Sequence, residues 1–248
     1  MKIGILGTGH IGKTLVRTLS AAGHDVKVAN SRGPETIDAD VLATGARAVT
    51  AADALKNVDV VILSIPLNRL STVASQITQL PAEVVVIDTS NYYPMRDGKI
   101  ESIEAGQVES LWVVEQLGRP IVKVWNAIGS DSFARKGTKP GAPNRIAIPV
   151  AADRDEQRKV AMSLVEDTGF DAVNAGTLAE SWRQQPGAPG YCTDLSREEL
   201  SAALLAAERT RLPKRRDLAV AAFIERYGDG TTNPDADYGV RLSRALFM

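Results

Sequence analysis

The stretch Lys2–Gly12, KIGILGTGHIG, decides the fold of this chain. Its first five residues are a short apolar run typical of a buried strand, and the pattern G-x-G-x-x-G follows at once. From His10 the apolar residues recur at helical spacing until Gly23, where a left-handed helix end forms without strain. A strand, a glycine-rich turn and a helix in this order predict the phosphate-binding turn of a dinucleotide site.

Each glycine of the motif has a separate task in that prediction. Gly7 permits a tight turn out of the strand, and Gly12 lets the helix lie close to the strand. Gly9 lacks the Cβ that would keep a pyrophosphate away from the backbone. The N–H groups that begin the helix would then face the phosphates. The alternative is a tight turn that binds no ligand.

The residues after the second predicted strand, Asp25–Ala29, indicate which dinucleotide is bound. A site for NAD usually has Asp or Glu at this place, which bonds the ribose 2′-hydroxyl. This chain has Asn30, Ser31 and Arg32 instead. A hydroxyl and a planar guanidinium suit a 2′-phosphate, so the loop favours NADP(H) over NAD(H). The alternatives are an arginine that stacks on the adenine or one that is merely solvated.

Working outward, short β-branched runs alternate with helix-length segments through most of the chain, which favours a parallel sheet covered on both faces. We expect an α/β fold with a doubly wound, mostly parallel sheet over residues 1–177. Residues 178–248 show helical patterns and are expected to form a small C-terminal helical cap beside the acceptor cleft. Further strands are expected at 46–49, 59–65, 83–88, 121–125, 145–150 and 171–174, and helices at 51–56, 70–80, 155–168, 196–211, 214–227 and 236–247.

Composition excludes several classes of protein. The 29 Lys and Arg balance 30 Asp and Glu, so the chain has no general attraction to nucleic acid or to an anionic membrane. One cysteine and two histidines predict no metal site, and no apolar run approaches the length of a membrane span. We expect a cytoplasmic protein, with a small molecule as its partner and homodimer formation left open.

Ligands of open α/β sheets bind beyond the carboxyl ends of the strands. Small and polar residues follow three of the predicted strands, and they suit a nicotinamide ring and its ribose. Asn91 and Asn126 are the candidates for lining the site of hydride transfer, since neither is needed to end a strand, whereas Pro66 is equally well explained as a strand terminator. The residues at these three places are Ile65-Pro66-Leu67, Thr89-Ser90-Asn91 and Asn126-Ala127-Ile128-Gly129.

No residue in these segments has the pattern of a strong acid–base catalyst, and the catalytic residue stays unknown. Tyr92 is followed four positions later by Arg96 rather than by lysine, and Cys192 lacks a context that would activate it. Reduction of a ketone needs a proton donor, whereas hydride transfer to a flavin-like ring needs mainly face-to-face positioning. The absence of an acid–base catalyst pattern in these segments therefore favours a flavin-like acceptor.

Two polar segments of the cap have open roles. The run 182–187, WRQQPG, is expected either to contact a second substrate or a subunit, or to form a surface turn. The basic run 209–216 is expected to be a solvated junction between helices.

These segments together resemble the F420-dependent NADP oxidoreductase family, and most closely its bacterial, dinucleotide-binding members. The likeness covers about residues 1–152 and rests on GTGHIGKTLVRTLSAAGHDV, NSRGPET, VDVVILSIP, VIDTSNYYP and VKVWNAIGSD. It implies a Rossmann domain that binds NADP(H) and a C-terminal part that helps to form the acceptor cleft. It also implies hydride transfer to a deazaflavin without an obligatory protein acid.

The resemblance also implies roles for single residues. Thr8, Gly9, His10 and Ile11 would contact the pyrophosphate, Ser31 and Arg32 the 2′-phosphate, Ser64, Ile65 and Pro66 the nicotinamide ribose, and Asn126 and Ile128 the ring. The C-terminal segment AESWRQQPGAPGYCTDL is longer and more polar than in archaeal deazaflavin reductases. The acceptor is therefore left open between F420, a flavin and another small molecule.

Three functions agree with these observations. The first is an NADPH-dependent oxidoreductase that passes hydride to a deazaflavin, a flavin or another small acceptor. The second is a non-catalytic NADP(H)-binding module that senses redox state or regulates a partner. The third is an imine reductase related to the pyrroline-carboxylate reductases, for which the roughly 70 cap residues are short.

Overall fold

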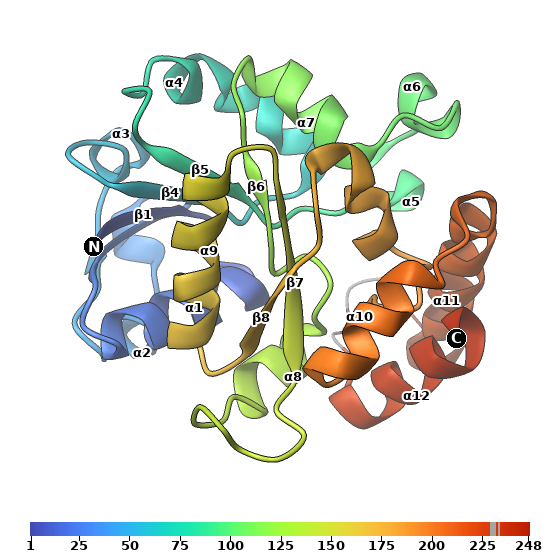
Figure 1. The fold of residues 1–248 in the computed structure, drawn as a ribbon. Coiled ribbons are helices and arrows are strands. Elements are labelled where there is room, and N and C mark those ends of the chain that lie inside the picture. The colour runs from blue at the N-terminus through green and yellow to red at the C-terminus, as the bar shows by residue number, and fades with distance from the viewer. Residues whose placement is uncertain (229–231, 233) are drawn as a thin grey trace.

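A sheet of eight strands runs through the computed structural model, which describes residues 1–228, 232 and 234–248 (Figure 1). The strands lie in the order β3-β2-β1-β4-β5-β6-β7-β8, and every neighbouring pair is parallel except β6 and β7. The order reverses direction after β1, as expected for a doubly wound sheet. The strands are β1 (Lys2–Leu6), β2 (Asp25–Ala29), β3 (Arg47–Ala48), β4 (Val60–Leu63), β5 (Val85–Asp88), β6 (Val122–Lys123), β7 (Ala147–Ala152) and β8 (Asp171–Asn174).

Helices cover both faces of the sheet, because the central strands are buried on both sides. Val60 and Ile62 of β4 belong to the cluster under α1 (His10–Ala21) and α9 (Asp155–Asp167). Val61 and Leu63 pack on the opposite face against three helices, which are α3 (Ala51–Ala54), α4 (Ala74–Thr78) and α7 (Glu109–Leu117). Alternate residues of one strand thus stabilise both layers. The remaining helices before the cap are α2 (Ala39–Leu42), α5 (Pro94–Asp97), α6 (Glu101–Glu104) and α8 (Ser130–Arg135).

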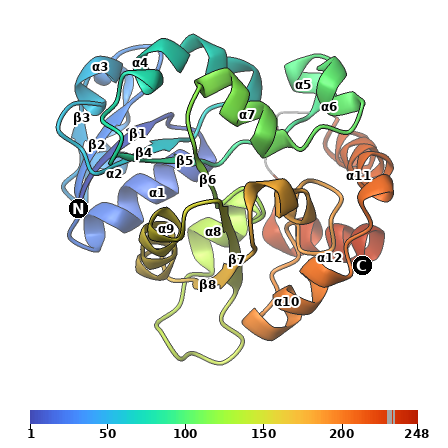
Figure 2. The same cartoon turned by 45° about the horizontal axis from the view of Figure 1, so that its top comes forward.

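The C-terminal helices gather at one end of the sheet, beyond β7 and β8 (Figure 2). They are α10 (Arg197–Leu205), α11 (Leu212–Tyr227) and α12 (Ala236–Phe247). A turn of 3-10 helix at Leu178–Gln184 leads into them. Within the predicted cap, residues 229–231 and 233 lie outside the described residues.

The fold class agrees with the sequence expectation, while several element bounds differ. The helix expected at 70–80 is split into a 3-10 turn, Leu67–Thr72, and the short α4. The helix expected at 196–211 ends at Leu205, and a separate 3-10 turn occupies Arg209–Arg211. The strand expected at 121–125 covers two residues, and the backbone at Trp125 is left-handed (φ 58°), which is incompatible with a strand. The helices α2 and α5 to α8 were not expected.

Candidate active site

The glycine turn is fixed by the packing of its first and last glycines. Gly7 has φ 112°, and a Cβ there would lie 2.0 Å from the carbonyl oxygen of Ser64. A Cβ on Gly12 would lie 2.2 Å from the carbonyl oxygen of Gly7. Both positions therefore require glycine to bring α1 against β1 and β4, for the reasons expected from the sequence.

Gly9 differs from these two glycines. It has φ −69°, an angle open to any residue, and no atom of the described part of the chain lies within 4 Å of the place where a Cβ would be. No side chain caps the helix that follows, and its first turn holds no acidic residue. An open cradle in front of free N–H groups fits a pyrophosphate. The flanking Thr8, His10 and Ile11 are at least partly exposed around it.

The loop after β2 is ordered by its own asparagine. The side-chain oxygen of Asn30 accepts hydrogen bonds from the backbone N–H groups of Arg32 (2.9 Å) and Gly33 (3.0 Å). Its Nδ2 donates to Thr36 Oγ1 at 2.8 Å. Ser31 and Arg32 are exposed on this loop, beside the glycine turn because β2 pairs with β1. Asn30 therefore shapes the loop, a role that the sequence pattern did not reveal.

Ser64, Ile65 and Pro66 follow β4, and the first two lie against the glycine turn. The backbone N–H of Ser64 donates to the carbonyl of Leu6 at 2.8 Å, which continues the β1–β4 ladder. Ile65 Cγ2 lies 3.1 Å from the place of a Cβ on Gly7. Ser64 and Ile65 thus border the turn, and none of the three residues lines the cavity described next.

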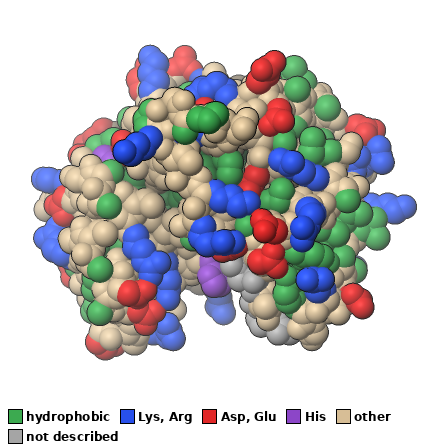
Figure 3. Space-filling view, turned by 90° about the horizontal axis from the view of Figure 1, so that it is seen from below, with side chains coloured by type: hydrophobic (Ala, Val, Ile, Leu, Met, Phe, Trp, Pro, Cys, Tyr) green, Lys and Arg blue, Asp and Glu red, His purple; other side chains and the backbone are tan. Residues whose placement is uncertain are grey.

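A cavity of about 470 Å³ lies between the carboxyl ends of the strands and the cap. Figure 3 shows the surface hollowed near the middle of one face, with charged side chains gathered around the hollow. The predicted residues that line the cavity are His10, Ile11, Thr89, Asn91, Asn126 and Ile128. Its cap side is lined by, among others, Tyr191, Cys192, Arg216, Ala219, Val220 and Phe223. Residues far apart in the sequence therefore form one cleft.

A chain of side-chain amides joins the sheet to the cap at the bottom of this cavity. Asn126 Nδ2 donates to Asn91 Oδ1 (3.1 Å) and to the carbonyl of Gln184 (2.8 Å). Gln184 Nε2 donates back to Asn126 Oδ1 at 2.8 Å. Asn91 Nδ2 donates to the carbonyl of Asn126 (2.9 Å) and to the hydroxyl of Tyr191 (3.2 Å). Both asparagines thus line the cavity, while all their N–H hydrogens are used by protein acceptors.

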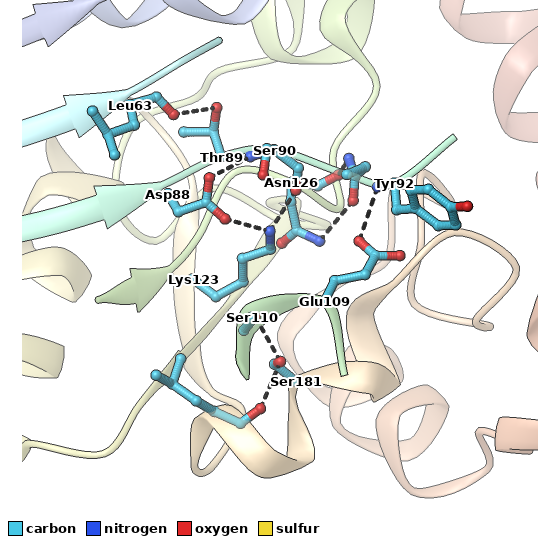
Figure 4. A network of polar contacts seen from close by, with 12 residues as sticks. Leu63, Asp88, Thr89, Ser90, Tyr92, Glu109, Ser110, Lys123, Asn126 and Ser181 are labelled. Atoms are coloured by element: carbon cyan, nitrogen blue, oxygen red, sulfur yellow. Dashed lines mark hydrogen bonds and ion pairs between the residues drawn. The ribbon is translucent and has the colours of Figure 1, made fainter. Parts of the chain in front are cut away.

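A buried ion pair joins the end of β5 to β6 (Figure 4). Lys123 Nζ lies 2.6 Å from Asp88 Oδ2, and both side chains are fully buried. Asp88 Oδ1 accepts the N–H of Ser90 at 3.0 Å, and Lys123 also donates to the Ser90 carbonyl. The pair therefore fixes the backbone of the turn that follows β5 and leads to Asn91.

Glu109 of α7 is a second buried acid in this region (Figure 4). Its carboxylate accepts the N–H of Tyr92 at 3.0 Å. Burial raises the pKa of Glu109, although nearby Lys123 and Arg216 oppose the rise. No pattern in the sequence singles out Glu109, since its importance depends on burial.

Two tyrosine hydroxyls meet at the cavity. The oxygens of Tyr93 and Tyr191 are 2.6 Å apart. Desolvation raises the pKa of both phenols well above the ordinary value, so both remain protonated at neutral pH. No local pattern in the sequence predicts the pair, because its members lie 98 positions apart.

The lone cysteine lies beside this pair. Burial raises the pKa of the Cys192 thiol to about 12, which agrees with the expectation that it is unreactive.

The cap corrects two expectations about its polar segments. Arg215 and Arg216 are buried, at 9% and 7% exposure, so the basic run is not simply a solvated junction. Arg216 is held over the ring of Tyr92, 5.3 Å from its centroid, and it lines the cavity. In the run 182–187, Gln184 is fully buried in the amide chain instead of lying in a surface turn.

The part of the chain that the structure describes holds no group of three potential metal-binding side chains. Over the same residues, no helix has the length and apolar character required to cross a membrane.

The model of the family described as "NADP oxidoreductase coenzyme F420-dependent" matches residues 2–92. Among curated proteins, YjhV of Escherichia coli K12 is 39% identical over 99 residues, which are 38% of this chain and 69% of YjhV. The family model ends before the cap.

Solved structures extend the likeness to the whole fold. The hypothetical protein SMa0349 of Sinorhizobium meliloti is 27% identical, with a TM-score of 0.67 over 79% of this chain and 95% of that one. A protein of Arthrobacter sp. FB24, provisionally described as an F420-dependent NADP reductase, is 16% identical. Its TM-score is 0.59 over 95% of this chain and 98% of its own, a likeness of fold.

Proposed function

This chain belongs to the coenzyme F420-dependent NADP oxidoreductase family through its residues 2–92, and on that premise we propose that it is an NADPH-dependent oxidoreductase. Its reaction is hydride transfer between NADP(H) and a small acceptor bound in the cavity under the cap. A deazaflavin, a flavin or another small electrophile is the proposed acceptor class, following the family description.

The observation that carries the proposal is the open cradle at Gly9. Protein packing explains glycine at positions 7 and 12, but none of the residues that the structure describes occupies the space over Gly9. Because that space lies at the start of α1 and the cavity begins at His10 and Ile11, a dinucleotide held there would extend into the cavity.

Different groups of residues would bind the different parts of NADP(H). Thr8 to Ile11 would hold the pyrophosphate, and Ser31 and Arg32 the 2′-phosphate. Ser64, Ile65 and Pro66 would border the nicotinamide ribose, with Thr89, Asn126 and Ile128 near the ring. When bound, NADPH supplies the hydride. The apolar wall of Ala219, Val220 and Phe223 would exclude water from the acceptor.

Coenzyme titration tests the binding part of the proposal. Arg32→Ala should weaken NADPH binding by about 1.5–3 kcal/mol, or ~10–150-fold in affinity, and leave NADH binding unchanged. The fluorescence of each reduced coenzyme, titrated separately, measures the two affinities. Arg47→Ala is the matched control, because Arg47 is an exposed arginine paired with Asp25 at the other end of β2. Equal binding of NADH and NADPH before and after Arg32→Ala would contradict the assignment.

Turnover tests the catalytic part. We expect stopped-flow loss of NADPH absorbance with at least one member of a panel of F420, FMN, FAD, an imine and an aldehyde. NADPH binding without oxidation by any of them would favour the non-catalytic binding module.

A further inference from the structure

We propose that the hydroxyl pair of Tyr93 and Tyr191 donates a hydrogen bond, and then a proton, to an acceptor whose reducible group is a polarised double bond such as a carbonyl. This inference rests on the proposed function, because it concerns the acceptor of the same hydride. It assigns a proton donor to a cleft in which the sequence pattern showed none.

The hydrogens of the pair can be counted. Each phenol carries one hydrogen, and the 2.6 Å contact between the two oxygens uses one of the two. In residues 1–228, 232 and 234–248, the second hydrogen has no further oxygen or nitrogen acceptor, and its one competing partner is the thiol of Cys192 beside Tyr191, a weak sulfur acceptor. Both side chains line the cavity, so the space available to that hydrogen is the cavity itself.

The amide chain orients the pair. Asn91 Nδ2 donates to the oxygen of Tyr191, so this oxygen is already an acceptor. If Tyr191 then donates to Tyr93, the hydroxyl oxygen of Tyr191 both accepts and donates, an arrangement in which hydrogen bonds strengthen one another. The unused hydrogen then lies on Tyr93, the less buried of the two.

The surroundings suit a donor that stays neutral. Desolvation keeps both phenols protonated, as their raised pKa values indicate. The guanidinium of Arg96 lies 5.4 Å from the centroid of the Tyr93 ring, where its charge opposes this rise in the pKa of Tyr93. An alkoxide is a stronger base than a phenolate, so proton transfer from the pair to a newly formed alkoxide is favourable.

The reaction balances without a further redox partner. The acceptor carbon takes the hydride that NADPH supplies, and the acceptor oxygen takes the hydroxyl hydrogen as the C=O double bond becomes a single bond. Water then returns a proton to the pair. The sum is carbonyl, NADPH and one proton giving alcohol and NADP⁺.

A binding experiment without NADPH tests the donor directly. The probe is 4-nitrophenolate, an aromatic oxyanion that cannot be reduced here without hydride and whose absorbance shifts when its oxygen accepts a hydrogen bond. We expect wild-type protein to bind it with such a shift. Tyr93→Phe should weaken binding, and Tyr93→Phe/Tyr191→Phe should weaken it about 10–150-fold, the value of a hydrogen bond to a charged group. Tyr227→Phe, on α11 outside the cavity lining, is the matched control.

Two binding results would overturn the inference. One is the absence of a saturable spectral shift with wild-type protein. The other is a double variant that binds 4-nitrophenolate as wild type does. A larger loss in Tyr191→Phe than in Tyr93→Phe would support the pair as donor, with the internal hydrogen bond running in the opposite direction.

Turnover separates this inference from the proposed function. With 4-nitrobenzaldehyde, whose oxygen needs a proton, the double variant should lose about 10²–10⁴-fold in kcat/KM. With 10-methylacridinium, a cation that takes a hydride and no proton, the rate above the uncatalysed background should be unchanged. If the variants reduce both probes like wild type, the donor role fails and the oxidoreductase stands. If wild type reduces no acceptor but binds 4-nitrophenolate through the tyrosines, the oxidoreductase fails and the donor stands.

Discussion

The two walls of the cleft are built in different ways. The coenzyme wall is continuous in sequence, since residues 7–12 supply the turn and residues 30–33 supply the loop beside it. The cap wall is assembled from distant segments, since Asn91 meets Tyr191 across 100 positions and Asn126 meets Gln184 across 58. Backbone conformation fixes the first wall, whereas buried side-chain hydrogen bonds fix the second.

This difference predicts how each wall responds to substitution. The coenzyme wall should fail through steric overlap of the backbone, and the cap wall through polar groups left buried without partners.

The largest effect is expected beneath the cap wall. Lys123→Met leaves the carboxylate of Asp88 buried without its cation, which should cost about 3–5 kcal/mol of unfolding free energy. Urea denaturation measures this loss. Lys56→Met is the control, because Lys56 and its partner Asp53 are exposed, so this change should cost less than about 1 kcal/mol. Similar losses in the two variants would show that the buried pair does not support the wall.

A smaller effect is expected in the glycine turn, where two alanine substitutions should behave differently. Gly7→Ala forces a Cβ against the Ser64 carbonyl at a positive φ and should cost about 3 kcal/mol of stability. Gly9→Ala enters open space and should change stability by less than about 0.5 kcal/mol. Gly9→Ala should nevertheless weaken NADPH binding at least ~10-fold, since its methyl group fills the phosphate cradle. Thermal unfolding and NADPH fluorescence measure the two quantities, and normal NADPH affinity in folded Gly9→Ala would refute the cradle.

The smallest effect concerns the pH dependence of Glu109. Burial raises the pKa of this acid in the folded state, so its contribution to stability is greatest at acidic pH and is lost as the pH rises through that pKa. Glu109→Gln keeps an acceptor for the Tyr92 N–H, so at low pH it should differ from wild type by no more than about 1 kcal/mol.

As the pH rises above the ordinary pKa range of a glutamic acid, the unfolding free energy of Glu109→Gln should increase relative to that of wild type. Unfolding free energies measured from acidic to neutral pH test this trend. A difference that is constant with pH would show that Glu109 ionises normally in the folded protein.

Much of the fold followed from local patterns, because continuous apolar runs such as β4 can be satisfied only between two layers of helices. The glycine turn was predictable for the same reason, since its geometry depends on residues within one turn of chain. The conformation of Trp125 was not predictable. Its left-handed backbone ends β6 early, and no pattern of residue types indicates such a conformation.

The cap wall could not be predicted from residue types. Arg216 in a basic run is normally solvated, and its burial over Tyr92 depends on how α11 packs. Tyr93 and Tyr191 are ordinary in their local sequences, and only the fold brings their hydroxyls together. Asn91 and Asn126 were found as strand-end residues, but their mutual hydrogen bonds were not.

The amide chain of Asn91, Asn126 and Gln184 contains no ionisable group. Neither acid nor added salt changes the charge on these partners, and mobile ions do not screen a contact between neutral dipoles as they screen an exposed ion pair. The width of the cleft where these amides meet should therefore be the same at low and at high salt concentration. It should also be the same at every pH at which the protein remains folded.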